Sequence, residues 1–332
     1  RGDAPLRGSI RAEGGSFATS NIAGQFGTSS EAMSLDVSAS RFATDGINVS
    51  AIVDENDGFT GSRDDGFENS TVSANWALRA SDKLSFSLFG RYVDSSSDFD
   101  AIGAAGFPVD ADRRSDVQLG LLRGQMNFEA FDSRWQHQLL ATLSDSRREN
   151  LADGELSDAS TGRKTILAYQ TSYDFLAAAG ALRGVLAVDH EQEEYSQRFV
   201  SFTGADQGQS RNTTGYVAEL LARPTAATDL SLSLRYDDHS NIRNKTTYRI
   251  AASHRLGGSS RLHASLGTGL KQPTFTELFG FFPDSFVGNP DLKPEESLGW
   301  DVGIEQSLFD ERLVADLTVF SMTLEDEIQT VF

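Results

Sequence analysis

The side chains suited to acid–base, metal or nucleophilic chemistry are scattered along this chain of 332 residues. The sequence has no cysteine, which excludes thiolate metal sites and cysteine nucleophiles. His190 is followed closely by Glu191, Glu193 and Glu194, but along a strand these residues would alternate between two faces. Neither an HExxH helix nor a Gly-x-Ser-x-Gly turn is present. The sequence therefore predicts a protein that is not an enzyme and has no catalytic residues.

Acidic residues outnumber basic ones, 48 against 29, which gives a formal net charge of −19. Proteins that bind nucleic acid need clustered Lys and Arg to neutralise phosphates, so we expect no nucleic-acid partner. The imbalance is steepest between residues 45 and 65, where one base, Arg63, faces six carboxylates: Asp45, Asp54, Glu55, Asp57, Asp64 and Asp65. Unpaired, these groups would repel one another. They are therefore solvated, bridged by ambient divalent ions to another anionic surface, or organised around a bound cation.

The elements that carry these residues are predicted to be strands, because apolar residues recur with a period of two. Leu230, Leu232 and Leu234 alternate with polar residues, and the runs near 84–92 and 262–270 show the same pattern. Side chains of a strand point alternately to opposite faces, so each run has one apolar and one polar face. No stretch approaches the roughly 18 to 20 apolar residues of a membrane helix, whereas the strands of a transmembrane β-barrel alternate in this way.

Fifteen strands are expected, near residues 5–16, 20–29, 32–44, 67–79, 83–95, 115–130, 134–147, 163–176, 181–196, 210–223, 228–240, 245–256, 260–271, 297–308 and 312–326. Such lengths fit tilted strands that cross a bilayer, roughly 9 to 11 residues, better than soluble strands of about 5 to 6. Short connections alternate with long polar ones near 45–66, 96–114, 148–162, 197–209 and 272–296, as in outer-membrane barrels. The predicted fold is all-β, a transmembrane antiparallel β-barrel, with a secreted solenoid or sandwich as the alternative.

The segment from Lys271 to Ser297 is the most distinctive in the chain. It contains four of the seven prolines, at positions 273, 283, 290 and 294. Proline removes a backbone donor, so this segment is predicted to be an ordered loop and not a central strand. On its own, this pattern indicates a rigid loop with no catalytic content.

The same segment resembles the TonB-dependent outer-membrane receptor family. The family pattern is a proline, then Glu-Leu-aromatic-Gly, then Gly-Asn-Pro-x-Leu-Lys-Pro-Glu-x-Ser. The matching residues are Pro273, Glu277, Leu278, Phe279, Gly280, Gly288, Asn289, Pro290, Leu292, Lys293, Pro294, Glu295 and Ser297. The resemblance implies a 22-stranded barrel closed by an N-terminal plug. Residues 1–332 would then be a partial barrel domain of about 15 strands, without the plug and the last strands.

The resemblance also implies a function. Receptors of this family lie in the outer membrane of Gram-negative bacteria, bind a scarce small ligand, and import it with energy delivered by the TonB complex. The implied partners are outer-membrane lipid, lipopolysaccharide, the ligand, and TonB through the missing plug segment. The isolated fragment is expected neither to insert stably nor to transport, because unpaired strand edges are costly in lipid.

Within the family, the chain resembles the vitamin B12 (cobalamin) receptors in three passages: Glu55–Phe59, Asp94–Ala101 and Arg235–Ser240. In those receptors the matching loop carboxylates bind calcium. The resemblance therefore implies a possible Ca²⁺ site, with the candidate ligands Glu55, Asp57, Asp100, Asp110 and Asp112. Carboxylate and carbonyl oxygens on loops suit this ion. A ferric-siderophore or haem receptor is the alternative within the family, and a passive porin-type channel is the alternative outside it.

Overall fold

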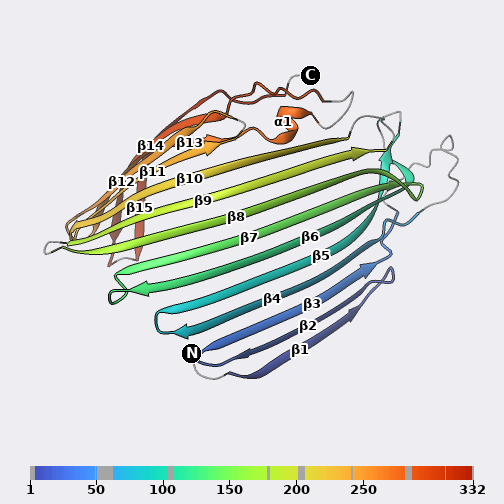
Figure 1. The fold of residues 1–332 in the computed structure, drawn as a ribbon, viewed down its shortest axis with the longest axis horizontal. Coiled ribbons are helices and arrows are strands. Elements are labelled where there is room, and N and C mark those ends of the chain that lie inside the picture. The colour runs from blue at the N-terminus through green and yellow to red at the C-terminus, as the bar shows by residue number, and fades with distance from the viewer. Residues whose placement is uncertain are drawn as a thin grey trace. The chain divides into compact units, whose positions relative to one another are not determined.

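The computed structural model describes residues 4–48, 50, 63–103, 106, 108–177, 180–200, 206–240, 242–280, 286–310 and 312–330. They form one sheet of fifteen strands, in which each strand is hydrogen-bonded to its neighbours in sequence (Figure 1). The strands are β1 (Ala4–Gly14), β2 (Ser20–Ser29), β3 (Met33–Thr44), β4 (Phe67–Ser81), β5 (Leu84–Ile102), β6 (Pro108–Ala130), β7 (Trp135–Ala152), β8 (Glu155–Ala177), β9 (Gly180–Phe199), β10 (Gln207–Thr225), β11 (Thr228–His239), β12 (Lys245–Leu256), β13 (Ser260–Lys271), β14 (Glu295–Leu308) and β15 (Leu313–Glu325). A short helix, α1 (Phe275–Phe279), lies between β13 and β14. The predicted all-β antiparallel fold and its strand number are confirmed.

The register gathers apolar side chains on one face of the sheet. Leu220 pairs with Leu232, which in turn pairs with Ile250 of the next strand. These three side chains are between 43% and 48% exposed, and all their strand neighbours on the opposite face except Leu221 are polar or small. Fully buried apolar side chains are few among the described residues, and the sheet therefore offers an apolar face to its surroundings instead of folding it into a core. Among the same residues, no helix is long and apolar enough to cross a membrane.

The chain divides into two compact units, which are described separately. Unit 1 comprises residues 1–126, 140–166 and 192–210, and unit 2 comprises residues 127–139, 167–191 and 211–332. The division passes through β6 to β10, so these strands contribute residues to both units. The candidate calcium ligands that the structure describes lie in unit 1, and the segment 272–294 lies in unit 2.

Two of the predicted long loops are wrong. Strands β5 and β6 occupy most of 96–114, and β7 and β8 meet at the turn Asp153–Gly154, inside the predicted loop 148–162. Backbone pairing continues there although the side chains no longer alternate in polarity, because the ladder needs only backbone donors and acceptors. Asp153 and Gly154 have positive φ angles of 53° and 77°, which a two-residue hairpin turn requires and which Asp-Gly readily adopts. Asp100, Asp110 and Asp112 therefore lie on strands.

Candidate functional site

The segment that follows β13 is built around the helix α1. Thr274 is the N-cap: its hydroxyl accepts a hydrogen bond from the Glu277 backbone at 3.2 Å, and the Glu277 carboxylate accepts one from the Thr274 backbone at 2.7 Å. This reciprocal pair is a capping box, which a Thr-x-x-Glu sequence favours. The helix ends at Gly280, whose φ of 84° suits glycine. The family-motif residues Glu277, Leu278, Phe279 and Gly280 thus form and terminate one helical turn.

The second half of the motif packs directly against this turn. A side-chain carbon at Gly288 would lie 2.4 Å from the Gly280 nitrogen and 2.5 Å from the Phe279 nitrogen. The backbone of Asn289 donates to the Glu277 carbonyl at 2.8 Å. Only glycine permits so close an approach of two backbones. The parts of the segment on either side of residues 281–285 are therefore fixed to each other. Residues 281–285 themselves lie outside the described part of the chain.

Strands of unit 2 hold the segment from several sides. Arg211 of β10 donates to the Pro273 carbonyl at 3.0 Å and stacks over the Phe275 ring at 5.0 Å. Pro273 is fully buried. At the other end, Glu295 accepts a hydrogen bond from the Ile328 backbone at 2.9 Å and forms an ion pair with Lys271 at 3.1 Å. Over its described residues the segment is ordered and is not a strand, as predicted, and its order comes from these contacts.

The remaining motif residues complete the second half of the segment. The Asn289 side chain accepts from the Asp291 backbone at 3.0 Å, and its carbonyl accepts from the Leu292 backbone at 3.3 Å. Pro290 is exposed and Pro294 is buried. Lys293 forms an exposed ion pair with Asp326 at 3.7 Å. These residues make a turn and its attachment to the chain that follows β15, and none of them forms a catalytic arrangement.

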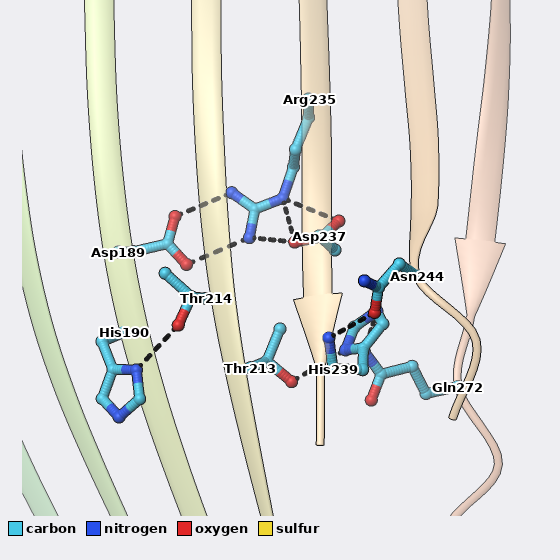
Figure 2. Close-up of polar contacts among 9 residues, drawn as sticks. All are labelled: Asp189, His190, Thr213, Thr214, Arg235, Asp237, His239, Asn244 and Gln272. Atoms are coloured by element: carbon cyan, nitrogen blue, oxygen red, sulfur yellow. Dashed lines mark hydrogen bonds and ion pairs between the residues drawn. The ribbon is translucent and has the colours of Figure 1, made fainter. Parts of the chain in front are cut away.

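An arginine bridge lies on the polar face of unit 2, on β9 to β11 (Figure 2). The Arg235 guanidinium donates to both carboxylate oxygens of Asp189, at 2.8 and 3.0 Å, and to Asp237 of its own strand at 2.8 Å. To reach Asp189, the side chain crosses β10 at Gly215, where a side-chain carbon would lie 2.1 Å from the Arg235 Nη2 atom. Planar, bidentate pairing of this kind is the strongest that arginine makes with carboxylates. The bridge therefore requires a residue without a side chain at position 215.

His239 connects the same strands to the loop segment (Figure 2). It is 7% exposed. Its Nδ1 lies 3.0 Å from the Thr213 hydroxyl and 3.0 Å from the Gln272 amide nitrogen, and its backbone nitrogen donates to Asn244 at 3.0 Å. The ring thus joins β10, β11 and the residue before Pro273. The third passage of the cobalamin-receptor resemblance, Arg235–Ser240, is a structural junction here.

The candidate calcium ligands are only partly brought together. Glu55 and Asp57 lie outside the described residues. Asp110, 2% exposed, accepts hydrogen bonds through one oxygen from the Asn48 side chain and the Arg63 backbone, both at 2.9 Å. Its other oxygen and one oxygen of Asp100 are buried without a hydrogen-bond partner. Orphaned carboxylate oxygens are costly unless a cation or water satisfies them, so this pair fits the donor chemistry of Ca²⁺.

Asp112, the remaining candidate ligand, has another partner, and the described residues offer few further ligands for a metal ion. Asp112 forms an ion pair with Arg63, which engages its carboxylate. Within the described ranges, no three His, Asp or Glu side chains are grouped to hold a metal ion. Asp100 and Asp110 alone cannot complete the six or so oxygens that Ca²⁺ takes. His190 and the glutamates that follow it in sequence have separate partners. The His190 ring lies 2.9 Å from the Thr214 hydroxyl, whereas Glu193 forms an ion pair with Lys164 at 3.1 Å.

Residues 8–332 match the family model described as "TonB dependent receptor-like, beta-barrel". The chain therefore belongs to the TonB-dependent receptor family, as part of its β-barrel. It is 29% identical over 251 residues to the vitamin B12 transporter BtuB of Photobacterium profundum, a match that spans 73% of this chain and 37% of that protein. To a BtuB of Vibrio vulnificus it is 27% identical over 244 residues, 72% of this chain and 37% of that protein.

Solved structures show the same fold. The siderophore receptor PirA from Acinetobacter baumannii superimposes with a TM-score of 0.71 at 16% identity, over 98% of this chain and 54% of that one. The RagAB peptide importer does so with a TM-score of 0.66 at 13% identity, over 92% and 44%. The chain thus spans little more than a third of the curated relatives and about half of the solved ones. These relatives and neighbours are transporters and receptors.

Proposed function

We propose that this chain forms part of an outer-membrane active-transport receptor of a Gram-negative bacterium, which binds a scarce small ligand for TonB-energised import. Membership of the receptor family over residues 8–332 is the observation that carries this proposal. The exposed apolar face of the sheet supports a lipid environment, with outer-membrane lipid and lipopolysaccharide as neighbours. The contact with TonB would be made through a plug segment.

Cobalamin is the ligand that we propose, because the relatives at 29% and 27% identity are vitamin B12 transporters. The likeness extends over nearly three-quarters of this chain. A ferric siderophore is the second candidate, supported by the fold of PirA at 16% identity. The sequence likeness is stronger for cobalamin, and on that ground it is placed first.

Calcium is proposed as a ligand of unit 1. Asp100 and Asp110 would hold it through their two partnerless oxygens, with the remaining oxygens supplied by Glu55, Asp57 or other neighbours. Bound there, Ca²⁺ would neutralise the two carboxylates and tie the region of Asn48 and Arg63 to β5 and β6, because both residues already bond Asp110. Asp112 is expected to stay with Arg63.

Titration of the intact, purified receptor tests the ligand. We expect saturable binding of cyanocobalamin that weakens when EGTA removes calcium, and no competition by a ferric catecholate. Saturable binding of the ferric catecholate without cyanocobalamin binding would overturn cobalamin in favour of the siderophore. Radiolabelled cyanocobalamin uptake by cells with and without TonB tests energisation, and equal uptake in the two strains would refute it.

A further inference from the structure

On the polar face of unit 1, one charged side chain reaches past its neighbouring strand to the next strand in the sheet. Arg7 of β1 lies opposite Gly27 of β2, which in turn lies opposite Asp36 of β3. The Arg7 guanidinium donates to the Asp36 carboxylate at 3.1 Å. A side-chain carbon at Gly27 would lie 2.6 Å from the Asp36 Oδ1 atom and 3.0 Å from the Arg7 Nε atom. The contact between β1 and β3 therefore depends on a glycine in the strand between them.

The polar face of unit 2 carries two further contacts of this kind. The first is the arginine bridge, which runs from β11 across β10 to β9 (Figure 2). In the second, His263 of β13 lies opposite Gly303 of β14, and its Nε2 atom lies 3.1 Å from the Asp316 carboxylate of β15. A side-chain carbon at Gly303 would lie 2.4 Å from that Nε2 atom. We call these three contacts the crossing bridges, because each passes over a glycine of the intervening strand.

In unit 2, both crossing bridges include a strand pair that no tight turn joins. β9 and β10 are connected by residues 200–206, and β13 and β14 by residues 272–294. A tight turn fixes the register of the two strands of its hairpin, whereas a longer connection allows one strand to shift along the other. Each bridge also includes the hairpin that follows, β10–β11 or β14–β15, whose turn is short. The bridge therefore ties a strand to a hairpin across the long connection.

The alternation of apolar and polar residues does not exclude a shift of two residues between neighbouring strands. Side chains alternate with a period of two, so such a shift leaves every side chain on its own face. The crossing bridges oppose this shift, because a side chain would then stand where the glycine now lies. The side chains that would replace the three glycines are Gln25 or Ser29 on β2, Thr213 or Val217 on β10, and Asp301 or Glu305 on β14.

From this geometry we infer that the crossing bridges specify the register of the strands that they span. In unit 2 the register also sets the attachment of the segment 272–294, because Lys271 lies opposite Glu295 and forms an ion pair with it at 3.1 Å. A shift of two residues between β13 and β14 would move this pair apart by roughly 7 Å. The histidine bridge thus holds the two strands from which the segment emerges in the register that closes its base. This inference concerns the assembly of the sheet and is independent of the ligand proposed above.

Disulfide trapping tests the inference on the intact receptor, refolded from urea into detergent under oxidising conditions. Residues 1–332 contain no cysteine that would compete. The reporter carries Ala264→Cys on β13 with Val302→Cys and Ile304→Cys on β14. Ala264 lies opposite Val302 in the native register, at about 5 Å between Cα atoms, whereas a residue two positions further is about 7–8 Å away, beyond disulfide reach. A disulfide to position 304 therefore reports the shifted register, and peptide mass spectrometry gives the ratio of the two disulfides. A second reporter, with Trp300→Cys in place of Ile304→Cys, detects the opposite shift.

The histidine bridge is removed by Asp316→Ala and, separately, by His263→Ala. Asp316 lies on β15, outside the reporter strands, and its side chain is 45% exposed, so this variant is expected to fold. The control is His254→Ala on β12, which removes a histidine whose ring lies 2.9 Å from the Thr228 hydroxyl of the adjacent strand. We expect the ratio of shifted to native disulfide to rise at least fivefold in both bridge variants and to stay at the reporter's own value in the control. An unchanged ratio in Asp316→Ala, or an equal rise in the control, would overturn the inference.

Discussion

Gly215 offers the sharpest test of how the polar face of unit 2 is held together. The Arg235 guanidinium passes over this glycine to reach Asp189, and a methyl group there would lie 2.1 Å from Nη2 and 2.5 Å from the central guanidinium carbon. Gly215→Ala must therefore displace the guanidinium and break both hydrogen bonds to Asp189, at 2.8 and 3.0 Å. The bond to Asp237, on the same strand as Arg235, is expected to survive.

The expected cost follows from these two bonds. A charge-assisted hydrogen bond contributes about 1.5–3 kcal/mol where it is buried. The Arg235 and Asp189 side chains are 35% and 26% exposed, so solvent screening reduces the loss for the pair to about 1–2 kcal/mol. Alanine is also favoured over glycine in a strand by about 0.5–1 kcal/mol. Gly215→Ala should therefore lower the free energy of unfolding by up to roughly 1.5 kcal/mol.

Unfolding of the intact receptor in lipid vesicles by guanidinium chloride measures this loss of stability. Gly120→Ala on β6 is the control, because a side-chain carbon there meets nothing within 4 Å, and it should be neutral or slightly stabilising. In an Arg235→Gln background the cost of Gly215→Ala should vanish, since no guanidinium remains to be displaced. An equal cost in both backgrounds would refute the reasoning.

Three further predictions concern the loop segment, the calcium pair and a hairpin turn. Arg211→Ala should increase hydrogen exchange and proteolysis at 273–280, because it removes the bond to the Pro273 carbonyl and the stacking on Phe275; unchanged protection would contradict this role. Asp110→Asn should weaken calcium binding by about tenfold or more, measured by calorimetry, whereas Asp132→Asn in the β6–β7 turn should not, and equal affinities would exclude the site. Gly154→Val should lower the free energy of unfolding by about 1–2 kcal/mol, because φ is 77° there, and an unaffected midpoint would show that the turn relaxes without cost.

The strand number and most strand positions could be predicted, because exposed apolar residues alternate with polar ones along most of the strands. β11 to β13 were located to within one residue, whereas β6 and β8 begin seven and eight residues earlier than expected. Their additional residues, such as those around Asp112 and Asp158, carry polar groups on both faces, so no period marks them. The Asp153–Gly154 dipeptide is a strong hairpin signal, and it alone could have corrected the predicted loop 148–162.

The loop segment was identified from its prolines and glycines, but its attachments were not. Arg211 lies 62 residues from Pro273, and Asp189 lies 46 residues from Arg235. Such pairs depend on the register of strands between them, which a single sequence does not specify. The glycine at 215 is visible in the sequence, yet only the path of the Arg235 side chain explains it. Among the calcium candidates, Asp100 and Asp110 could be named from the sequence. The ion pair between Asp112 and Arg63 could not be anticipated from it.

The two-residue turn between β7 and β8 has a practical consequence. Its tip, Asp153 and Gly154, is exposed, and the space around Gly154 is open. Turn tips of this kind tolerate inserted sequence well, so a short epitope placed after Gly154 should leave the flanking ladder intact. In outer-membrane barrels the longer loops face the cell exterior, and this turn lies at the same end of the sheet as the long connection between β3 and β4. Under the proposed function, the tip therefore faces the cell exterior. Antibody staining of unbroken cells would then reveal the sidedness of the protein directly, without any knowledge of its ligand.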